Sequence, residues 1–260
     1  MKRVGNLFPR IHTLETLRIA YWRAGIGKRT RRDAQQFAEQ LDGNLRDLSR
    51  GIQTGRLPCG DFHQFLIRDP KERLITAPAF SERVLHHAIL HVCEPWFERW
   101  LIDDTFACRR GRGRLKALER ARRFARHFPF YLKLDIRKYF DSIPHELLLV
   151  RLERVFKDRD LLRLFEQIVQ LYRGDLGRGL PIGSLTSQHF ANFYLGWFDR
   201  FVKERLRIRG YVRYMDDMVL WGNSSQEMQQ VQLACCEFLQ EELQLETKPF
   251  RINSTSHGMD

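Results

Sequence analysis

The stretch Tyr211-Val-Arg-Tyr-Met-Asp-Asp-Met-Val-Leu-Trp221 carries two adjacent carboxylates, Asp216 and Asp217, between two runs of β-prone residues. It predicts two short strands joined by a tight turn. Paired acids in apolar surroundings are costly, because like charges repel and each carboxylate prefers water. A divalent cation removes that cost, so the turn predicts a magnesium anchor for phosphoryl transfer. The alternative is an ordinary hairpin turn that contains two aspartates.

The composition favours a folded chain with a polyanionic partner. Its 260 residues are 43% hydrophobic, enough to bury a core in one large domain or two intergrown ones. Lys and Arg number 44 against 32 acids, giving a formal net charge of +12. That excess favours nucleic acid first and an anionic membrane second. No run approaches the roughly 18 apolar residues that cross a bilayer, and no signal peptide is visible, so we expect a cytoplasmic protein without membrane contact.

The first part of the chain shows helical spacing of its apolar residues. The pattern predicts a helix over 13–24 and a second one that passes through Phe37 and Leu48 and ends near Gly51. The segment 25–32 between them is basic and contains glycines. It either grips phosphates or simply faces water.

A change of pattern after residue 55 predicts a β-hairpin with strands over 61–67 and 73–77. A proline-containing turn joins them, and its cations, with Arg68 and Arg73, could reach a triphosphate. The following segment, 81–100, has helical periodicity, so we expect its histidines to be ordinary helix residues rather than metal ligands.

The most basic stretch is Thr105-Phe-Ala-Cys-Arg-Arg-Gly-Arg-Gly-Arg114. Its glycines let a backbone approach a sugar-phosphate chain closely. A basic helix over 116–127 follows. We expect four arginines of the loop to contact the nucleic-acid backbone: Arg109, Arg110, Arg112 and Arg114.

The segment 128–141 begins as an alternating, aromatic-rich run, which predicts a central strand that ends at Asp135. A carboxylate at the end of a buried strand is rarely there for packing. Folding would have to bring it to Asp216, where a cation is again the natural partner. Phe140 then offers a flat wall beside the metal that would exclude a ribose 2′-hydroxyl, unless it is simply a core aromatic.

Three motifs in this order closely resemble those of reverse transcriptases. They are the Asp135 strand with its aromatic residue five positions later, the block Gly179-Leu-Pro-Ile-Gly-Ser-Leu-Thr-Ser-Gln188 before an aromatic-rich helix, and Tyr214-Met-Asp-Asp217. The hairpin near residue 70 and the Arg-Arg-Gly-Arg-Gly segment resemble further blocks of bacterial members. The resemblance therefore spans roughly residues 55–260.

The resemblance implies an α+β fold, with the fingers and palm of a right-hand polymerase and an antiparallel palm sheet packed on helices. It predicts an N-terminal helical extension over 1–54, fingers over 55–127, and a palm over 128–260 that includes a fingers insertion at about 150–178. We expect no thumb within this chain.

The resemblance also implies a catalytic set of Asp135, Asp216 and Asp217. Asp135 and Asp216 would hold two Mg²⁺ ions, or Mn²⁺ in their place, with the backbone carbonyl of Ile136 as an extra oxygen ligand and Asp217 in support. Further positions match residues that bind the nucleotide: Arg68, Arg73, Phe140, Ile182, Gly183, Gln188 and Lys248. Among them, Gly183 would allow nucleotide or template to approach the backbone, and Lys248 would lie near the leaving group.

Ile182 and Gln188 resemble the variant found in diversity-generating retroelements, since most reverse transcriptases have Gln-Gly ending in Ser-Pro at this block. A pocket that only packs distinguishes competing bases weakly. We therefore expect error-prone copying of a template RNA into cDNA, with errors concentrated at adenines. The partners implied are template RNA, primer, deoxynucleoside triphosphates and a small basic helical accessory protein.

Other functions compete with this interpretation. A group II intron-type reverse transcriptase is disfavoured by Ile182 and Gln188, and an antiphage-defence reverse transcriptase would be separated only by its gene neighbourhood. An RNA polymerase would want a polar residue in place of Phe140. An idle RNA-binding scaffold would not need the three aspartates.

Overall fold

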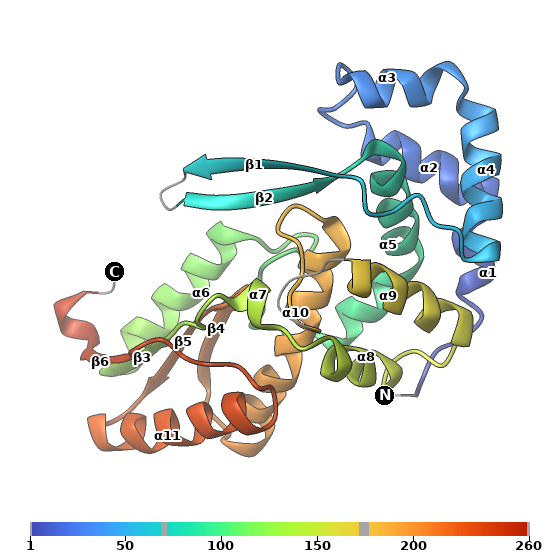
Figure 1. Ribbon diagram of the computed structural model, residues 1–260. Helices are drawn as coiled ribbons and strands as arrows, with labels where there is room; N and C mark the ends of the chain where they lie inside the picture. Colours follow the sequence, from blue (N-terminus) through green and yellow to red (C-terminus); the bar gives the residue numbers. More distant parts are fainter. Residues whose placement is uncertain (1, 69–71, 172–176, 259–260) are drawn as a thin grey trace. The chain divides into compact units, whose positions relative to one another are not determined.

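The computed structural model describes residues 2–68, 72–171 and 177–258 (Figure 1). The chain forms two compact units. The first unit contains residues 1–96 and 145–188, and the second contains residues 97–144 and 189–260. The fold class is mixed α+β with antiparallel pairing, as the sequence predicts.

The N-terminal helices of the first unit are α1 (Phe8–Ile11), α2 (Leu14–Ala24), α3 (Arg32–Glu39) and α4 (Leu41–Thr54). The helix expected over 13–24 is confirmed, and the Thr13 side chain caps it by accepting a hydrogen bond from the Thr16 N–H at 3.2 Å. The single helix expected through Phe37 and Leu48 was wrong, because the chain breaks at Gln40. The second of the two helices ends beyond Gly51, where Gly55 adopts a φ of 73° that closes the C-terminus.

The predicted hairpin consists of β1 (Phe62–Arg68) and β2 (Glu72–Pro78), which pair antiparallel from Phe62 opposite Pro78 to Arg68 opposite Glu72. Most of β1 is exposed. The predicted proline-containing turn, with Lys71, lies outside the described residues. The helix predicted over 81–100 is confirmed as α5 (Phe80–Trp100).

The remaining helices of the first unit are α8 (His145–Glu153), α9 (Arg159–Leu171) and the start of α10 (Leu185–Arg200). Asp158, just before α9, accepts hydrogen bonds from the backbone N–H groups of Leu7 and Phe8, both at 3.0 Å. These bonds satisfy donors at the start of α1 that have no partner within that helix. The chain start is thereby fixed to a segment about 150 residues away.

The second unit is built on a four-stranded antiparallel sheet with the order β4 (Gly210–Tyr214), β5 (Asp217–Gly222), β3 (Phe130–Leu134) and β6 (Arg251–Ser254). The strand predicted before Asp135 is therefore central, as expected. The helical elements of this unit, besides the ends of α5 and α10, are α6 (Arg114–His127), α7 (Tyr139–Ser142), α11 (Ser225–Glu241) and the short helical turns at Phe201–Arg205 and Thr255–His257.

Helices cover both faces of this sheet, with α6 on one side and α11 on the other (Figure 1). Alternation along the strands explains why, since successive side chains point to opposite faces. Tyr131 and Trp221 belong to the apolar cluster beneath α6, and their neighbours Leu132 and Leu220 are fully buried as well. The predicted domain boundaries stay a prediction, but α6, which they assign to the fingers, packs on the sheet of the second unit.

Among the residues that the structure describes, no helix is long and apolar enough to span a bilayer.

Candidate active site

The acidic turn lies at the tip of the β4–β5 hairpin. Tyr214 pairs with Asp217, so the turn consists of Met215 and Asp216 alone. Met215 has a φ of 57°, in the left-handed region that side chains other than glycine disfavour. Two-residue hairpins with positive φ at the first turn position usually place glycine there. The two predicted strands are confirmed, and their connection contains a strained methionine beside the acids.

Strand register brings Asp135 to the same end of the sheet. Leu134, the last residue of β3, pairs with Met218 of β5. The next residue in each direction is Asp135 on one strand and Asp217 on the other. Acids from two distant segments therefore lie on neighbouring strands, while their role as a metal-binding set stays a prediction.

The electrostatics of Asp216 show that the acids influence one another. Burial raises the pKa of its carboxyl, and the charges of Asp217 and Asp135 raise it further. Its own backbone N–H and the Lys248 ammonium act in the opposite direction. Proximity of like charges in a partly buried site makes ionisation unfavourable, and a divalent cation would offset this.

Lys248 lies at Asp135 itself. Its Nζ is 2.5 Å from the Asp135 Oδ2, and its backbone N–H donates to the Asp135 carbonyl at 2.8 Å. The resemblance suggested a position near the leaving group; here the ammonium acts as the counterion of Asp135. Ile136 is buried and forms an antiparallel bridge with Thr247, so the chain next to Asp135 is paired on this side.

The donor set suits a metal ion that the substrate helps to bind. Among the described residues, no group of three or more His, Cys, Asp or Glu side chains is arranged to hold an ion. Mg²⁺ commonly takes one or two carboxylates and completes its octahedral shell with water and phosphate oxygens. Asp135 and Asp216 supply oxygen ligands of this kind, and the raised pKa of Asp216 identifies a charge that needs compensation. The residues fit an open site completed by phosphates rather than a closed protein cage.

A cavity of about 200 Å³ beside Asp135 is lined by Lys248, which the sequence predicted, and by two cations that it did not, Lys133 and Arg251. Lys133 and Arg251 are direct partners in the β3–β6 ladder, and Lys248 lines the same cavity. Like charges directly opposite each other on a sheet are unfavourable, so an anion there would stabilise the pair. The signal for Lys133 was in the sequence, since positions 133 and 135 of an extended segment share a face.

Phe140 lies on α7, in the same unit as the aspartates. Its ring is half-buried and packs edge-on against Tyr139, with 5.7 Å between the ring centroids. Tyr139 is buried and donates a hydrogen bond from its hydroxyl to the Ala191 carbonyl, which fixes the short helix. The predicted function of Phe140 as a sugar-selecting wall stays a prediction.

The predicted phosphate-gripping residues Arg68 and Arg73 belong to the hairpin of the first unit. The Arg68 side chain is 82% exposed and lies 2.9 Å from Glu72. Arg73 is also exposed, opposite Ile67 in the ladder. Both guanidinium groups are accessible, and an exposed ion pair such as Arg68–Glu72 is weak enough to open for a phosphate.

The loop at Ile182 and Gly183 contacts β2 directly. The Thr76 N–H donates to the Ile182 carbonyl at 2.7 Å. Gly183 has a φ of 125°, and a Cβ there would lie 2.9 Å from the Thr76 carbonyl oxygen and 3.0 Å from the Ile75 side chain. The structure therefore gives a packing reason for glycine at this position, the backbone of β2, while its predicted role in admitting nucleotide or template stays a prediction.

A buried chain of hydrogen bonds supports this loop. Ser184 Oγ lies 3.1 Å from Thr186 Oγ1, which lies 2.8 Å from His86 Nδ1. The other ring nitrogen of His86 is 3.2 Å from Glu82, whose second oxygen accepts from the Gly60 N–H at 3.0 Å. Sequence reasoning treated His86 as an ordinary helix residue. The available signal was the Glu82–His86 spacing of four, which places both on one helix face.

Of the four arginines predicted to contact the nucleic-acid backbone, Arg109 is a correction. Its side chain is 5% exposed, 3.0 Å from Glu98, and its Nη1 donates to the Ile102 and Thr105 carbonyls. The Arg109 guanidinium is therefore paired inside the protein and is not exposed to a nucleic-acid backbone. Arg112 lies 2.8 Å from Asp103. The exposed members of the set are Arg110 and Arg114.

The sequence profile of the family described as "Reverse transcriptase (RNA-dependent DNA polymerase)" matches residues 68–253, well over half of the chain. The chain therefore belongs to the reverse transcriptase family.

Among curated proteins, the chain is similar to nuclear intron maturase 4, mitochondrial, of Arabidopsis thaliana, with 28% identity over 192 residues that cover 71% of this chain and 24% of the maturase. It is also similar to protein YkfC of Escherichia coli, with 26% identity over 167 residues, covering 60% of this chain and 43% of YkfC. The chain thus spans less than half the length of these relatives.

Among solved structures, telomerase from Candida albicans, in complex with a fragment of telomeric RNA, superposes with a TM-score of 0.55 at 13% identity, covering 74% of this chain and 42% of telomerase. Apo telomerase from Candida tropicalis gives 0.56 at 11% identity, covering 74% and 50%. At this identity the likeness concerns the fold alone, and the expected fold of fingers and palm is confirmed.

Proposed function

We propose that this protein is an RNA-directed DNA polymerase that extends a primer along a template RNA with deoxynucleoside triphosphates. The observation that carries the proposal is the register of β3 and β5, because it puts Asp135, the residue directly after β3, next to the Asp216–Asp217 turn. Membership of the reverse transcriptase family supports the same reaction.

Each acid has a distinct part in this proposal. Asp135 and Asp216 would hold two Mg²⁺ ions, with the Ile136 carbonyl as a further ligand and Asp217 in support. When bound, such ions activate a primer 3′-hydroxyl and neutralise the charge of the triphosphate and its leaving group. Lys248 pairs with the Asp135 carboxylate and lines the adjoining cavity, where its ammonium would be available to an anionic group of the substrate.

Substrate selection uses other side chains. Phe140 excludes a ribose 2′-hydroxyl by bulk, and Arg68 and Arg73 grip phosphates as accessible cations. Ile182 and Gln188 contribute shape and a polar contact to the nucleotide or template.

The finer proposal is an error-prone enzyme of the diversity-generating retroelement type, acting in the cytoplasm with a small basic accessory protein. Its support is the pair Ile182 and Gln188, because a side chain that only packs discriminates bases weakly. Ile182→Gln should lower misincorporation opposite template adenines. An unchanged error spectrum would remove this explanation and leave the polymerase proposal intact.

A second candidate is an intron-associated reverse transcriptase, favoured by similarity to proteins named as intron maturases. The two candidates differ in fidelity. Sequencing of cDNA copied from one template separates them, since a retroelement enzyme concentrates its errors at adenines and an intron-type enzyme does not.

Primer extension tests the reaction itself. We expect extension of a DNA primer on RNA with deoxynucleotides in Mg²⁺, little with ribonucleotides, and none in EDTA. Asp135→Asn and Asp216→Asn should each reduce the rate by at least about 1,000-fold. Asp141→Asn, an exposed acid in the same unit, is the matched control and should leave the rate unchanged. Extension that survives in both active-site variants would refute the proposal.

A further inference from the structure

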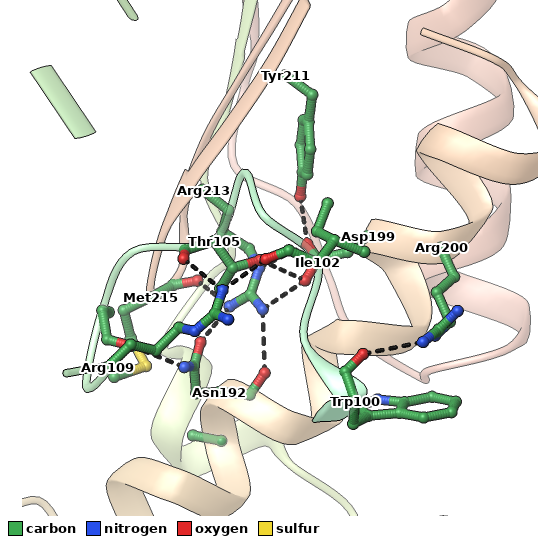
Figure 2. A network of polar contacts seen from close by, with 12 residues as sticks. Trp100, Ile102, Thr105, Arg109, Asn192, Asp199, Arg200, Tyr211, Arg213 and Met215 are labelled. Carbon is green, nitrogen blue, oxygen red and sulfur yellow. Dashed lines mark hydrogen bonds and ion pairs between the residues drawn. The ribbon is translucent and has the colours of Figure 1, made fainter. Parts of the chain in front are cut away.

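A fully buried ion pair lies behind the acidic turn. The side chains of Arg213, on β4, and Asp199, on α10, are both 0% exposed. The guanidinium forms a two-pronged contact, with Nε 2.7 Å from Oδ1 and Nη2 2.7 Å from Oδ2 (Figure 2). Such parallel bonds fix the orientation of both groups as well as their distance.

The carboxylate of this pair has further donors. The Tyr211 hydroxyl donates to one Asp199 oxygen at 2.7 Å, and the Thr105 hydroxyl donates to the other at 2.9 Å. Burial by itself would lower the pKa of Arg213, but the Asp199 carboxylate outweighs it, so the pKa is raised. The guanidinium therefore stays charged throughout the range in which an enzyme works.

The remaining donors of Arg213 connect the pair to the turn. Nη1 donates to the Asn192 side-chain oxygen and to the Met215 carbonyl, both at 2.8 Å, and Nη2 donates to the Asn192 carbonyl at 3.0 Å (Figure 2). Asn192 is itself fixed by donating to the Ala107 carbonyl at 2.8 Å. The bond to Met215 is the important one, because that carbonyl belongs to the peptide that joins Met215 to Asp216.

The turn needs such support. Met215 has a positive φ, a conformation that persists in a residue with a side chain only where the surroundings impose it. A turn that relaxed would rotate the next peptide and carry the Asp216 carboxylate with it. The buried guanidinium is the group that holds this peptide from behind.

We propose that Arg213 is a positioning residue for the acidic turn, which its guanidinium holds in the strained conformation that keeps Asp216 directed toward Asp135. This inference rests on the proposed polymerase function. Arg213 touches no substrate in this scheme and acts only through the Met215 carbonyl. The alternative is that the pair merely stabilises the fold of the second unit.

Arg213→Lys separates these roles, because lysine keeps the charge beside Asp199 but cannot make the same fork of bonds. We expect kcat for primer extension to fall about 10- to 100-fold and the midpoint Mg²⁺ concentration to rise about tenfold, as for the loss of groups that orient metal ligands. The KM for the deoxynucleotide should stay within about twofold. Tyr211→Phe is the matched control, since it removes a donor to Asp199 and leaves the Met215 bond intact.

A rescue experiment is the sharper test. Glycine adopts positive φ without strain, so Met215→Gly removes the need for support. Added to Arg213→Lys, it should restore kcat about tenfold. A stabilising role alone predicts no restoration, and that result would overturn the proposal.

A second variant covers the case in which Arg213→Lys fails to fold. If Arg213→Lys does not fold, the double variant Arg213→Met with Asp199→Leu replaces the buried pair with apolar side chains of similar size, a change that proteins often tolerate. It should fold, lose activity about 10- to 100-fold and respond to Met215→Gly in the same way. A folded double variant with full activity would overturn the proposal.

Metal affinity is measured without catalysis, as the rise in melting temperature on titration with Mn²⁺. A weaker Mn²⁺ response in Arg213→Lys that Met215→Gly restores would support the positioning role even if the wild-type protein extends no primer. An active wild-type protein with an unchanged kcat and an unchanged Mn²⁺ response in Arg213→Lys would refute the positioning role and leave the proposed function standing.

Discussion

Two buried polar networks support two loops of this protein, and they are made of different chemistry. Behind the acidic turn of the second unit lies the Arg213–Asp199 ion pair, with both side chains fully buried. Behind the Ile182–Gly183 loop of the first unit lies a chain of single hydrogen bonds from Glu82 through His86 to two hydroxyl groups. A forked ion pair fixes orientation, whereas hydroxyls and an imidazole can rotate or exchange tautomers.

The two networks differ because the two loops contain different residues at their positions of positive φ. Met215 has a φ of 57° and Gly183 a φ of 125°, so both loops contain a residue with positive φ. Glycine adopts such a conformation freely, and its network only has to orient the loop. Methionine does not, so its network must also oppose strain. The forked ion pair, which is the stronger interaction, therefore lies behind the loop whose backbone conformation is costly.

Removing an anion from the ion pair should have the largest effect. Asp199→Ala leaves the Arg213 guanidinium buried without a counterion, and we expect a loss of about 3–5 kcal/mol in the free energy of unfolding. His86→Ala, in the other network, should cost about 1–3 kcal/mol, because it leaves neutral or singly bonded groups unpaired. Urea unfolding followed by circular dichroism compares the two variants. Equal losses would contradict the distinction between the networks.

Gly183 and Met215, which both have a positive φ, should differ in how well they tolerate exchange of their side chains. Gly183→Ala combines backbone strain with a Cβ 2.9 Å from the Thr76 carbonyl oxygen, so we expect a loss of about 2–3 kcal/mol. Met215→Gly should stay within about 1 kcal/mol of wild type, since relief of strain offsets the added freedom of the unfolded chain. Thermal unfolding tests both, and a tolerated Gly183→Ala would show that β2 yields to the added methyl group.

Acidification should destabilise both units through two partly buried histidines that lie outside the networks, His87 and His189. Burial lowers the pKa of His189 to about 4, and burial followed by the charges of Arg83, His86 and Arg23 lowers that of His87 to about 4. On acidification the unfolded chain takes up these protons first. Stability present above pH 6.5 is therefore lost as the pH falls toward 4.

For His189 this loss amounts to about 2 kcal/mol at pH 5. Urea unfolding at pH 7.5 and pH 5 measures it, and His189→Asn is the control that should flatten the dependence. An equal pH dependence in that variant would show that other groups are responsible.

The smallest expected effect is a gain in stability, from substitution of Asp216. Asp216→Asn removes a charge whose pKa is raised by burial and by Asp217 and Asp135. In EDTA we expect the variant to be slightly more stable than the wild type while it loses primer extension. Differential scanning calorimetry measures the melting temperatures of the wild type and the variant with and without Mg²⁺. The wild type should gain stability with metal, and the variant should not. A less stable variant in EDTA would mean that the acids do not oppose one another.

Several elements could be predicted because their signals are local. The hairpin 62–78, the helix 80–100 and the strands around the acidic turn follow from apolar periodicity and β propensity within a few residues. The break at Gln40 could not be predicted, because the apolar spacing continues across it. The approach of Asp135 to the turn was predicted from chemistry, because a carboxylate at the end of a buried strand is rarely there for packing.

By itself, the sequence determined the secondary structure of most segments and led to the prediction of the residues that carry the chemistry, because propensity and charge belong to each residue and its neighbours. Only the tertiary structure decided which charged side chains are buried and paired inside the protein. Arg213 and Arg109 are ordinary basic residues in the sequence, and each is buried because a distant segment supplies its acid. A buried charge is stable only with such a partner, and the partner is determined by the folded chain.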